Sequence, residues 1–229
     1  MTARRAAASD RPAPAKRGAR RAPGRPVGGE QALREALIDA ALQAFAGAGF
    51  AASTLRGIAR AAHVTPALAN YYFGSKEGLL AAVVELRVQP LFEQLAAAMA
   101  GAGDDPLAAL AAFAQTYTRL ALSHPWGPQL VVREVLSAGG ALREAFAQRF
   151  AGNISRLLAE HVAKAQQLGH IDAALDPRLT ALSLLSLCVF PVISAPVLAV
   201  TLGLRLDADA AMALANHHWR VFARGVETE

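Results

Sequence analysis

Apolar side chains recur every three or four residues from Glu30 onward, which is the spacing of one face of an α-helix. The first of these stripes ends at Gly47 and Gly49, because a glycine just past the last turn is a common helix stop. Beyond Pro90 further helical stripes follow, separated by short breaks at 101–106, 123–125, 139–140, 169–177 and 203–207. No segment shows the sustained alternation of a half-buried β-strand. The sequence therefore predicts an all-α fold, whose last two helices run over about 177–203 and 208–226.

Two short helices joined by a tight turn follow the first one. Ser53 and Thr54 favour an N-cap for the second helix, and Thr65 caps a third helix that has Pro66 at its first position. This third helix is about two turns long and ends at Gly74. A bundle helix followed by two helices around a short turn is the helix-turn-helix arrangement. The sequence thus predicts an N-terminal three-helix DNA-binding domain.

The third helix has the composition that a DNA-reading helix needs. A helix that enters the major groove presents small or polar side chains outward and keeps only a thin apolar stripe inward. Val64, Ala69 and Phe73 suit the inward stripe. The residues expected to face outward are Thr65, Pro66, Ala67, Asn70 and Tyr71. Asn70 can pair bidentately with adenine, and Ala67 can contact a thymine methyl group.

The stretch 36–80 reads ALIDAALQAFAGAGFAASTLRGIARAAHVTPALANYYFGSKEGLL and resembles the DNA-binding domain of the TetR family of repressors. The similarity is nearly continuous over these 45 residues. It includes the A-F-x-x-x-G-F closure of the first helix, the T-L-R-x-I-A-x-x-A second helix and the Y-F-G-S-K-E-G-L-L exit. A signature of this length is far more specific than a lone glycine motif.

The resemblance implies a set of DNA-contacting residues, namely Thr54, Arg56, Thr65, Ala67, Asn70, Tyr71, Tyr72 and Lys76. Thr54 and Lys76 would hold phosphates, and Arg56 would reach a base edge or the backbone. The groove would receive the outward residues of the third helix, while Tyr72 would lie on the DNA backbone or in the protein core. Two positions depart from the family. Asn70 stands where many members have tyrosine, which we interpret as an altered sequence preference, and His63 replaces the usual glycine of the turn, so the turn is expected to be strained or shifted.

The positive charge of the chain is concentrated at its N-terminus. Residues 1–29 carry eight basic side chains and one acidic one, a net charge of +7, whereas the other 200 residues carry 15 basic and 17 acidic ones. We expect this Pro/Gly/Arg-rich tail to be disordered in the free protein and to follow phosphates or enter a minor groove on DNA. Its segment 23–26 resembles the core of an AT-hook; a solubilising arm or an organellar transit peptide are the alternatives. Residues 30–85 are not net basic, so this domain alone should bind DNA only modestly.

Residues 179–204 form a long apolar run without a charged side chain. Its length would suffice for a transmembrane helix. However, Pro191 and Pro196 interrupt it, serine and threonine residues dilute it, and no aromatic belt flanks it. In several TetR-family members the last two helices of each subunit form a four-helix dimer interface, which would bury this run. We therefore predict a homodimer through the last two helices and no membrane association.

Large side chains in the C-terminal half define a candidate effector pocket. The residues predicted to line it are Phe113, Tyr117, Trp126, Leu130 and Phe146, with Arg133, Arg119 or His124 as polar contacts. The resemblance is only architectural here, because the C-terminal domains of the family vary greatly. We expect a largely apolar small molecule that lowers the affinity for DNA by shifting the population of dimer conformations.

Signals for an enzyme or a metal site are missing. The chain has no G-x-S-x-G, phosphate loop, H-E-x-x-H, or G-x-G-x-x-G after a strand. Cys188 is the only cysteine, which excludes an intramolecular disulfide and a cysteine-based zinc cluster and suits a reducing cytoplasm. His217 and His218 are neighbours on a helix and point apart. We expect no cofactor, no metal and no catalytic residues.

Together these observations predict a ligand-responsive, sequence-specific transcriptional regulator in the bacterial cytoplasm, associated with the nucleoid. It would be a repressor that a small molecule releases from a palindromic operator in double-stranded DNA. The predicted organisation is a disordered basic tail at 1–29, a helix-turn-helix domain at 30–85, and a helical ligand-binding and dimerisation domain at 86–229. Two alternatives stay open: a membrane-associated helical protein that uses residues 179–204, and a DNA-binding protein that does not respond to a ligand.

Overall fold

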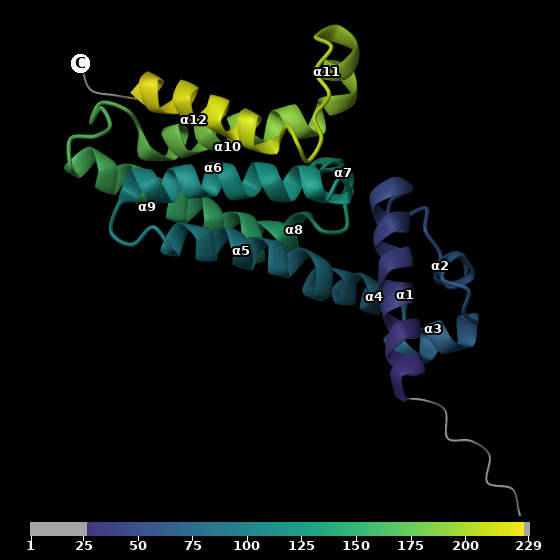
Figure 1. The fold of residues 1–229 in the computed structure, drawn as a ribbon. Coiled ribbons are helices and arrows are strands. Elements are labelled where there is room, and N and C mark those ends of the chain that lie inside the picture. The colour runs from purple at the N-terminus through teal and green to yellow at the C-terminus, as the bar shows by residue number, and fades with distance from the viewer. Residues whose placement is uncertain (1–26, 227–229) are drawn as a thin grey trace, which may run out of the picture.

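The computed structural model describes residues 27–226, and this range contains helices and no β-strand (Figure 1). The N-terminal helices are α1 (Val27–Gly47), α2 (Leu55–Ala61), α3 (Pro66–Phe73) and α4 (Lys76–Val83). The C-terminal helices are α5 (Gln89–Ala100), α6 (Pro106–Ser123), α7 (Trp126–Leu130), α8 (Arg143–Phe146), α9 (Gly152–Gln167), α10 (Pro177–Ile193), α11 (Ala195–Thr201) and α12 (Ala211–Val226). The π-helical segments η1 (Val84–Val88), η2 (Val131–Leu136) and η3 (Ala147–Ala151) continue α4, α7 and α8. The predicted all-α fold is confirmed. α1 begins at Val27, three residues before the predicted start, and the basic tail before it lies outside the described residues.

Side-chain caps start α2, α3 and α4 of the N-terminal part, and the predicted caps Thr54 and Thr65 are confirmed. The hydroxyl oxygens of Thr54, Thr65 and Ser75 accept hydrogen bonds from backbone N–H groups three residues further on, at 3.0, 3.3 and 3.1 Å. Pro66 occupies the first position of α3, where its missing N–H leaves no bond unmade. These caps satisfy donors that a helix start cannot pair internally, and they fix where α2, α3 and α4 begin.

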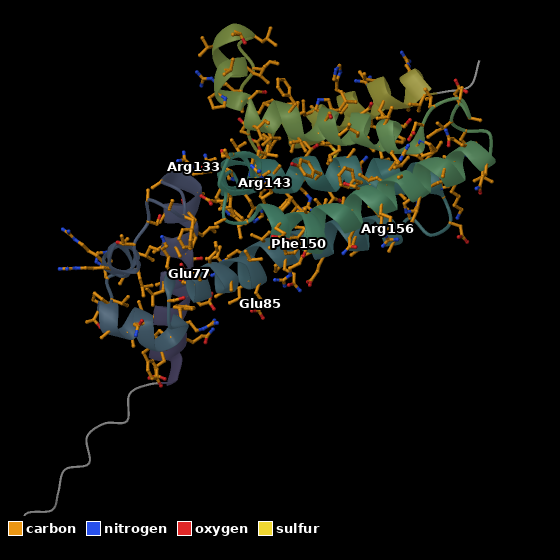
Figure 2. The ribbon with its side chains drawn as sticks, turned by 180° about the vertical axis from the view of Figure 1, so that it is seen from behind. Glu77, Glu85, Arg133, Arg143, Phe150 and Arg156 are labelled. Atoms are coloured by element: carbon orange, nitrogen blue, oxygen red, sulfur yellow. The ribbon has the colours of Figure 1, made fainter. Side chains whose placement is uncertain are left out.

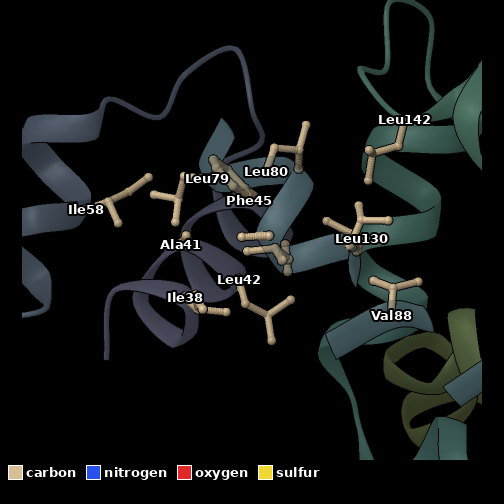
Figure 3. Packing of buried hydrophobic residues seen from close by; sticks show 14 of the residues in the cluster. Ile38, Ala41, Leu42, Phe45, Ile58, Leu79, Leu80, Val88, Leu130 and Leu142 are labelled. Carbon is tan, nitrogen blue, oxygen red and sulfur yellow. The ribbon is translucent and has the colours of Figure 1, made fainter. Parts of the chain in front are cut away.

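One hydrophobic cluster joins the helix-turn-helix to the C-terminal part. Leu37 and Phe45 of α1 and Leu79 of α4 are completely buried at its centre. Leu130 and Leu142 reach the same cluster from the C-terminal side, as Figure 3 shows. The helical backbone also runs unbroken from α4 through η1 into α5, so the predicted domain boundary at residue 85 lies inside a helix. A movement of the C-terminal part would therefore act directly on the helix-turn-helix.

The C-terminal part is a layered bundle. α6 lies in its middle and packs against α5 and α9 on one side and against α10 and α12 on the other (Figure 1). Its core contains completely buried side chains such as Phe113, Leu158 and Leu184. In Figure 1 α10 and α12 form the outer layer, and several of their apolar side chains remain exposed, including Leu179, Phe190 and Met212.

The apolar run 179–204 is not one helix, and the predicted helix over 177–203 is corrected here. α10 ends at Ile193, and the axis of α11 is turned from that of α10 by 73°. The reason is local: Pro196 has no N–H to continue the hydrogen-bond ladder of α10, and its ring crowds the carbonyl group four residues earlier. Among the described residues no single helix is long and apolar enough to cross a membrane, although the bent pair α10 and α11 passes that test on length and composition.

Candidate functional site

α3 presents its polar side outward at the end of the molecule remote from the C-terminal bundle (Figure 1). Ala69 is completely buried, and Tyr72 and Phe73 pack partly against the core cluster. The opposite face is open to solvent, and Tyr71 is 80% exposed. The exposed residues of this face are Thr65, Pro66, Ala67, Asn70 and Tyr71. The structure thus brings together the side chains that were predicted to lie in the groove.

The residues flanking α3 differ in how much they are open to solvent. Thr54 is exposed at the start of α2, and its hydroxyl still has a proton to donate while its oxygen caps the helix. Arg56 is exposed on the same helix. Tyr72 is half-buried, and its hydroxyl donates to the carbonyl oxygen of Glu30 at 3.5 Å. Thr54 and Arg56 are therefore free to reach a backbone phosphate, whereas Tyr72 is mainly part of the packing.

Lys76 is half-buried and holds the loop between α1 and α2. Its ammonium donates to the carbonyl oxygens of Phe50 at 2.7 Å and Ser53 at 2.9 Å, and it lies 4.2 Å from the centre of the Phe50 ring. Two of its three protons are thus used inside the protein. The predicted phosphate contact of Lys76 has only the third proton left, and sequence reasoning missed the positioning role that the structure shows.

Glu134 of η2 binds the same loop from the C-terminal part. This residue is only 4% exposed, and one of its carboxylate oxygens accepts a hydrogen bond from Phe50 N at 2.7 Å. The other oxygen accepts from Ala141 N at 3.1 Å. The peptide groups of Phe50 are therefore held between a carboxylate of the C-terminal part and the ammonium of Lys76 on α4. A signal for Glu134 existed in the sequence, because it falls at helical spacing on the apolar side of its own segment.

His63 carries the left-handed position of the turn between α2 and α3. Its φ is +56°, and it is the one non-glycine residue with a positive φ among residues 27–226. Val64 N still donates to Ala59 O at 2.9 Å, so the turn is retained and not shifted. The exchange of glycine for histidine leaves an L-residue in a conformation that glycine adopts without steric cost.

A partly open cavity of about 510 Å³ lies in the C-terminal part, in the size range of small-molecule sites. Its wall includes the predicted residues Phe113, Tyr117, Trp126, Leu130, Phe146 and His124. Side chains of α5, η2 and α10 complete it, among them Phe92, Val135 and Leu185. The lining is almost entirely apolar, so the cavity suits a largely apolar molecule.

Tyr117 is a half-buried polar side chain in this wall. Its hydroxyl has no hydrogen-bond partner within the described range of the chain. Burial among apolar side chains raises the pKa of Tyr117 well above its usual value, so the phenol stays protonated. An effector with an acceptor atom at this point would receive a hydrogen bond from it.

Arg133 does not line the cavity, which corrects its assignment as an effector contact. η2 turns Val131 and Val135 toward the cavity, and Arg133 lies on the opposite side, exposed and close to Gly49 at the end of α1 (Figure 2). The arginine that lines the cavity is Arg143, which donates to the carbonyl oxygens at the end of η2, such as Val135 O at 3.0 Å. Sequence reasoning missed Arg143 because it begins α8, a helix of four residues that is too short to show helical periodicity.

Acidic, histidine and cysteine side chains form no cluster of three or more within residues 27–226 that could hold a metal ion. Cys188 is completely buried in the core, where burial raises the pKa of its thiol to about 12. The outward face of α3 and the cavity lined by Tyr117 contain most of the residues that the sequence predicted for DNA and effector binding.

Comparison with known families assigns these two features together. A model described as "Bacterial regulatory proteins, tetR family" matches residues 37–83, and one described as "Tetracyclin repressor-like, C-terminal domain" matches residues 106–221, slightly more than half of the chain. The chain belongs to the TetR family. The resemblance predicted from residues 36–80 is thereby confirmed. TetR-family proteins are transcription regulators that bind DNA through the helix-turn-helix, and they are not enzymes.

Individual relatives match over limited stretches. The HTH-type transcriptional regulator BetI of Rhizobium meliloti (strain 1021) is 47% identical over 76 residues, which cover 33% of this chain and 37% of the relative. BetI of Burkholderia thailandensis is 35% identical over 86 residues, or 38% and 44% of the two chains. The chain thus matches less than half the length of these TetR-family relatives.

Solved TetR-like structures match nearly the whole fold at low identity. The ketosteroid transcriptional regulator KstR2 of Mycobacterium tuberculosis has a TM-score of 0.68 at 18% identity, covering 86% of this chain and 95% of that one. The regulator FadR of Bacillus subtilis, solved in complex with stearoyl-CoA, has a TM-score of 0.66 at 20% identity, covering 84% and 99%. These likenesses establish that the arrangement of α1–α12 is a known TetR-family fold.

Proposed function

We propose that this TetR-family protein is a ligand-responsive repressor, which binds a palindromic operator as a homodimer and is released by a largely apolar small molecule. The observation that carries the proposal is the outward face of α3, with Asn70 and Tyr71 exposed in a chain whose family reads DNA with this element. Such a protein would act in the bacterial cytoplasm, on the nucleoid.

The residues that contact DNA would fall into two groups, those that contact base edges and those that contact backbone phosphates. Asn70 and Ala67 have the chemistry to contact base edges, and Thr54 and Arg56 that to hold phosphates. The holding residues add little net charge, because residues 30–85 are not net basic. The basic tail, with its net charge of +7, would supply much of the salt-dependent affinity.

Dimerisation would use the outer layer formed by α10 and α12. Exposed Leu179, Leu182 and Phe190 on α10 and Met212 and Val221 on α12 make this layer an apolar surface. Exposed apolar surface of this extent on a helical layer is typical of an interface between subunits. Two copies joined there would present two α3 helices to one operator.

The effector would act through the segments that both line the cavity and hold the helix-turn-helix. η2 contributes Val131 and Val135 to the cavity and Glu134 to the Phe50 peptide, while α5 continues η1 and α4. A molecule that moves η2 or α5 would therefore move the loop in front of α2. FadR of Bacillus subtilis, which has a similar fold, was solved in complex with stearoyl-CoA, and the long apolar acyl chain of that molecule supports a largely apolar effector here.

The test is operator binding by a variant that changes only the outward face of α3. An operator is selected from random duplex DNA with the full chain, and the affinity of Asn70→Ala/Tyr71→Ala for it is measured by fluorescence anisotropy. We expect loss of specific binding with an intact dimer in sedimentation, because each lost base contact costs about 1–3 kcal/mol. Asn153→Ala, an exposed asparagine on α9, is the matched control and should bind normally.

Unchanged affinity of the double variant would overturn the assignment of α3. The proposed response to an effector is tested separately, by adding apolar carboxylates and acyl thioesters to the complex of wild-type protein and operator DNA. Failure of every such compound to change operator affinity, with operator binding intact, would favour a regulator without a ligand response.

A further inference from the structure

A helical hook stands out from the dimerisation layer. It consists of residues 194–204, that is, α11 with its flanking residues, and it follows α10 after the 73° bend. In Figures 1 and 2, which view the molecule from opposite sides, α11 rises above the α10–α12 layer, away from α6 and α9. The hook thus projects into the space that a partner seated on this layer would occupy.

The hook is apolar and has no cover within the described part of this chain. None of the residues of α11 is buried, and Val200 is 86% exposed. Val197, Leu202 and Leu204 are exposed as well, and the hook contains no charged side chain. A solvent-exposed helix of a monomer ordinarily carries polar side chains on its outer face. The composition of this one is that of a buried element.

The backbone of the hook is nevertheless held by specific hydrogen bonds. Ser194 Oγ donates to Phe190 O at 2.6 Å across the bend, and Leu202 N and Leu204 N both donate to Leu198 O, at 3.0 and 3.3 Å. Gly203, with a φ of +68°, allows the chain to turn back toward α12. An isolated helix of this length is unstable in water, so contacts with another surface have to maintain it.

We propose that the hook of each subunit packs across the partner subunit of the same dimer and forms part of the interface. This inference rests on the dimer of the proposed function. A second copy is the occupant that fits, because the apolar surface runs without a charged side chain from Leu179 of α10, past Phe190, into Val197 and Val200. The interface therefore includes both the α10–α12 layer and the hook, which packs against the partner subunit.

Accessibility of a cysteine on the hook tests this directly. Val200→Cys is labelled with a maleimide in the full chain, and its rate is compared with that of Leu168→Cys. Leu168 is also exposed but lies at the end of α9, at the opposite end of the bundle from α11. The native Cys188 gives little background, because it is completely buried.

We expect the thiol at position 200 to react at least about tenfold more slowly than the one at position 168 in the dimer, and equally fast after dilution to monomer, since a covered group reacts only when exposed. Val200→Asp should weaken the dimer by about 10- to 100-fold, and Leu168→Asp should leave it unchanged.

Each other outcome has a distinct meaning. A dimer in sedimentation with equal labelling rates at both positions would show that the hook does not pack against the partner, while leaving the proposed dimer in place. A monomer at every concentration would overturn the proposed dimer itself. Protection of position 200 only in the presence of lipid vesicles would mean that the hook contacts a membrane, and this too would contradict the inference.

Discussion

Replacement of Glu134 by glutamine should separate the effector cavity from the helix-turn-helix. The carboxylate accepts one N–H bond on each oxygen, from Phe50 at 2.7 Å and from Ala141 at 3.1 Å. The glutamine amide has one acceptor oxygen and one donor nitrogen, so one of these N–H groups would face an N–H₂ group and lose its bond. Hydrogen bonds to a charged group contribute about 1.5–3 kcal/mol each, and an unpaired buried donor costs a similar amount. We expect Glu134→Gln to lower the free energy of unfolding by about 2 kcal/mol.

The functional result should be larger than the loss of stability suggests. Loss of the bond from Phe50 N would remove the hydrogen bond between η2 and the loop before α2, so a movement of η2 would be transmitted to this loop less directly. The assay is the operator dissociation constant with and without effector, together with urea unfolding. We expect the factor by which effector weakens operator binding to fall toward one in Glu134→Gln. Because coupling is reciprocal, the factor by which operator weakens effector binding should fall to the same value.

Glu144→Gln is the matched control, because Glu144 is an exposed glutamate on α8 with only a local partner, Gln148, at 3.3 Å. It should retain both the stability and the response to effector. The reasoning would be refuted if Glu134→Gln unfolded within about 0.5 kcal/mol of wild type, the range of ordinary surface substitutions. It would equally be refuted by a full effector response in a variant that is destabilised as expected.

Other substitutions test single steps of the account. Tyr117→Phe should leave stability nearly unchanged and weaken the binding of an effector with an acceptor group by about 2- to 10-fold in calorimetry, because only the unpaired phenol proton is lost; equal affinities would remove Tyr117 from the site. Glu35→Gln breaks the contact of Glu35 with Arg87 at 2.6 Å, whose hydrogen bond holds the pKa of Glu35 below its usual 4.5. Because the pKa of Glu35 is lowered in the folded protein, the free energy of unfolding of wild type should exceed that of this variant by no more than ~1 kcal/mol above about pH 4.5. This difference should vanish as the pH falls through the folded pKa, and a difference that grows in acid would contradict the expectation. Because the φ of His63 is +56°, His63→Gly should raise the free energy of unfolding by up to about 1 kcal/mol, and His63→Val should lower it by about 1–2 kcal/mol. Urea unfolding measures both changes, and the opposite order would show that the turn differs in solution.

The features that the sequence predicted correctly are those that depend on neighbouring residues. Thr54 and Thr65 cap their helices through bonds that span three residues, so the local pattern was sufficient to place α2 and α3. Exposure of Asn70 and Tyr71 followed from the periodicity of α3 in the same way.

The features that it missed depend on distant residues or on a break in periodicity. The bond from Phe50 N to Glu134 joins positions 84 apart; helical spacing could indicate that Glu134 faces inward, but not which backbone group it binds. Arg133 was misplaced because the direction of η2 relative to the cavity is set by packing against α1. Pro191 and Pro196 both interrupt the apolar run in the sequence, but only Pro196 coincides with the bend, whereas Pro191 lies inside α10; the local pattern did not distinguish the two.

Hydroxyl-radical footprinting on the selected operator tests the central claim most directly, because it records where the paired α3 helices contact DNA. We expect two symmetric protected patches on one face of the duplex, centred on the half-sites of an inverted repeat and separated by about 10–10.5 base pairs or a multiple of that. A single unpaired patch, or protection that follows no symmetric sequence, would contradict the view that this protein reads DNA with α3 as a dimer.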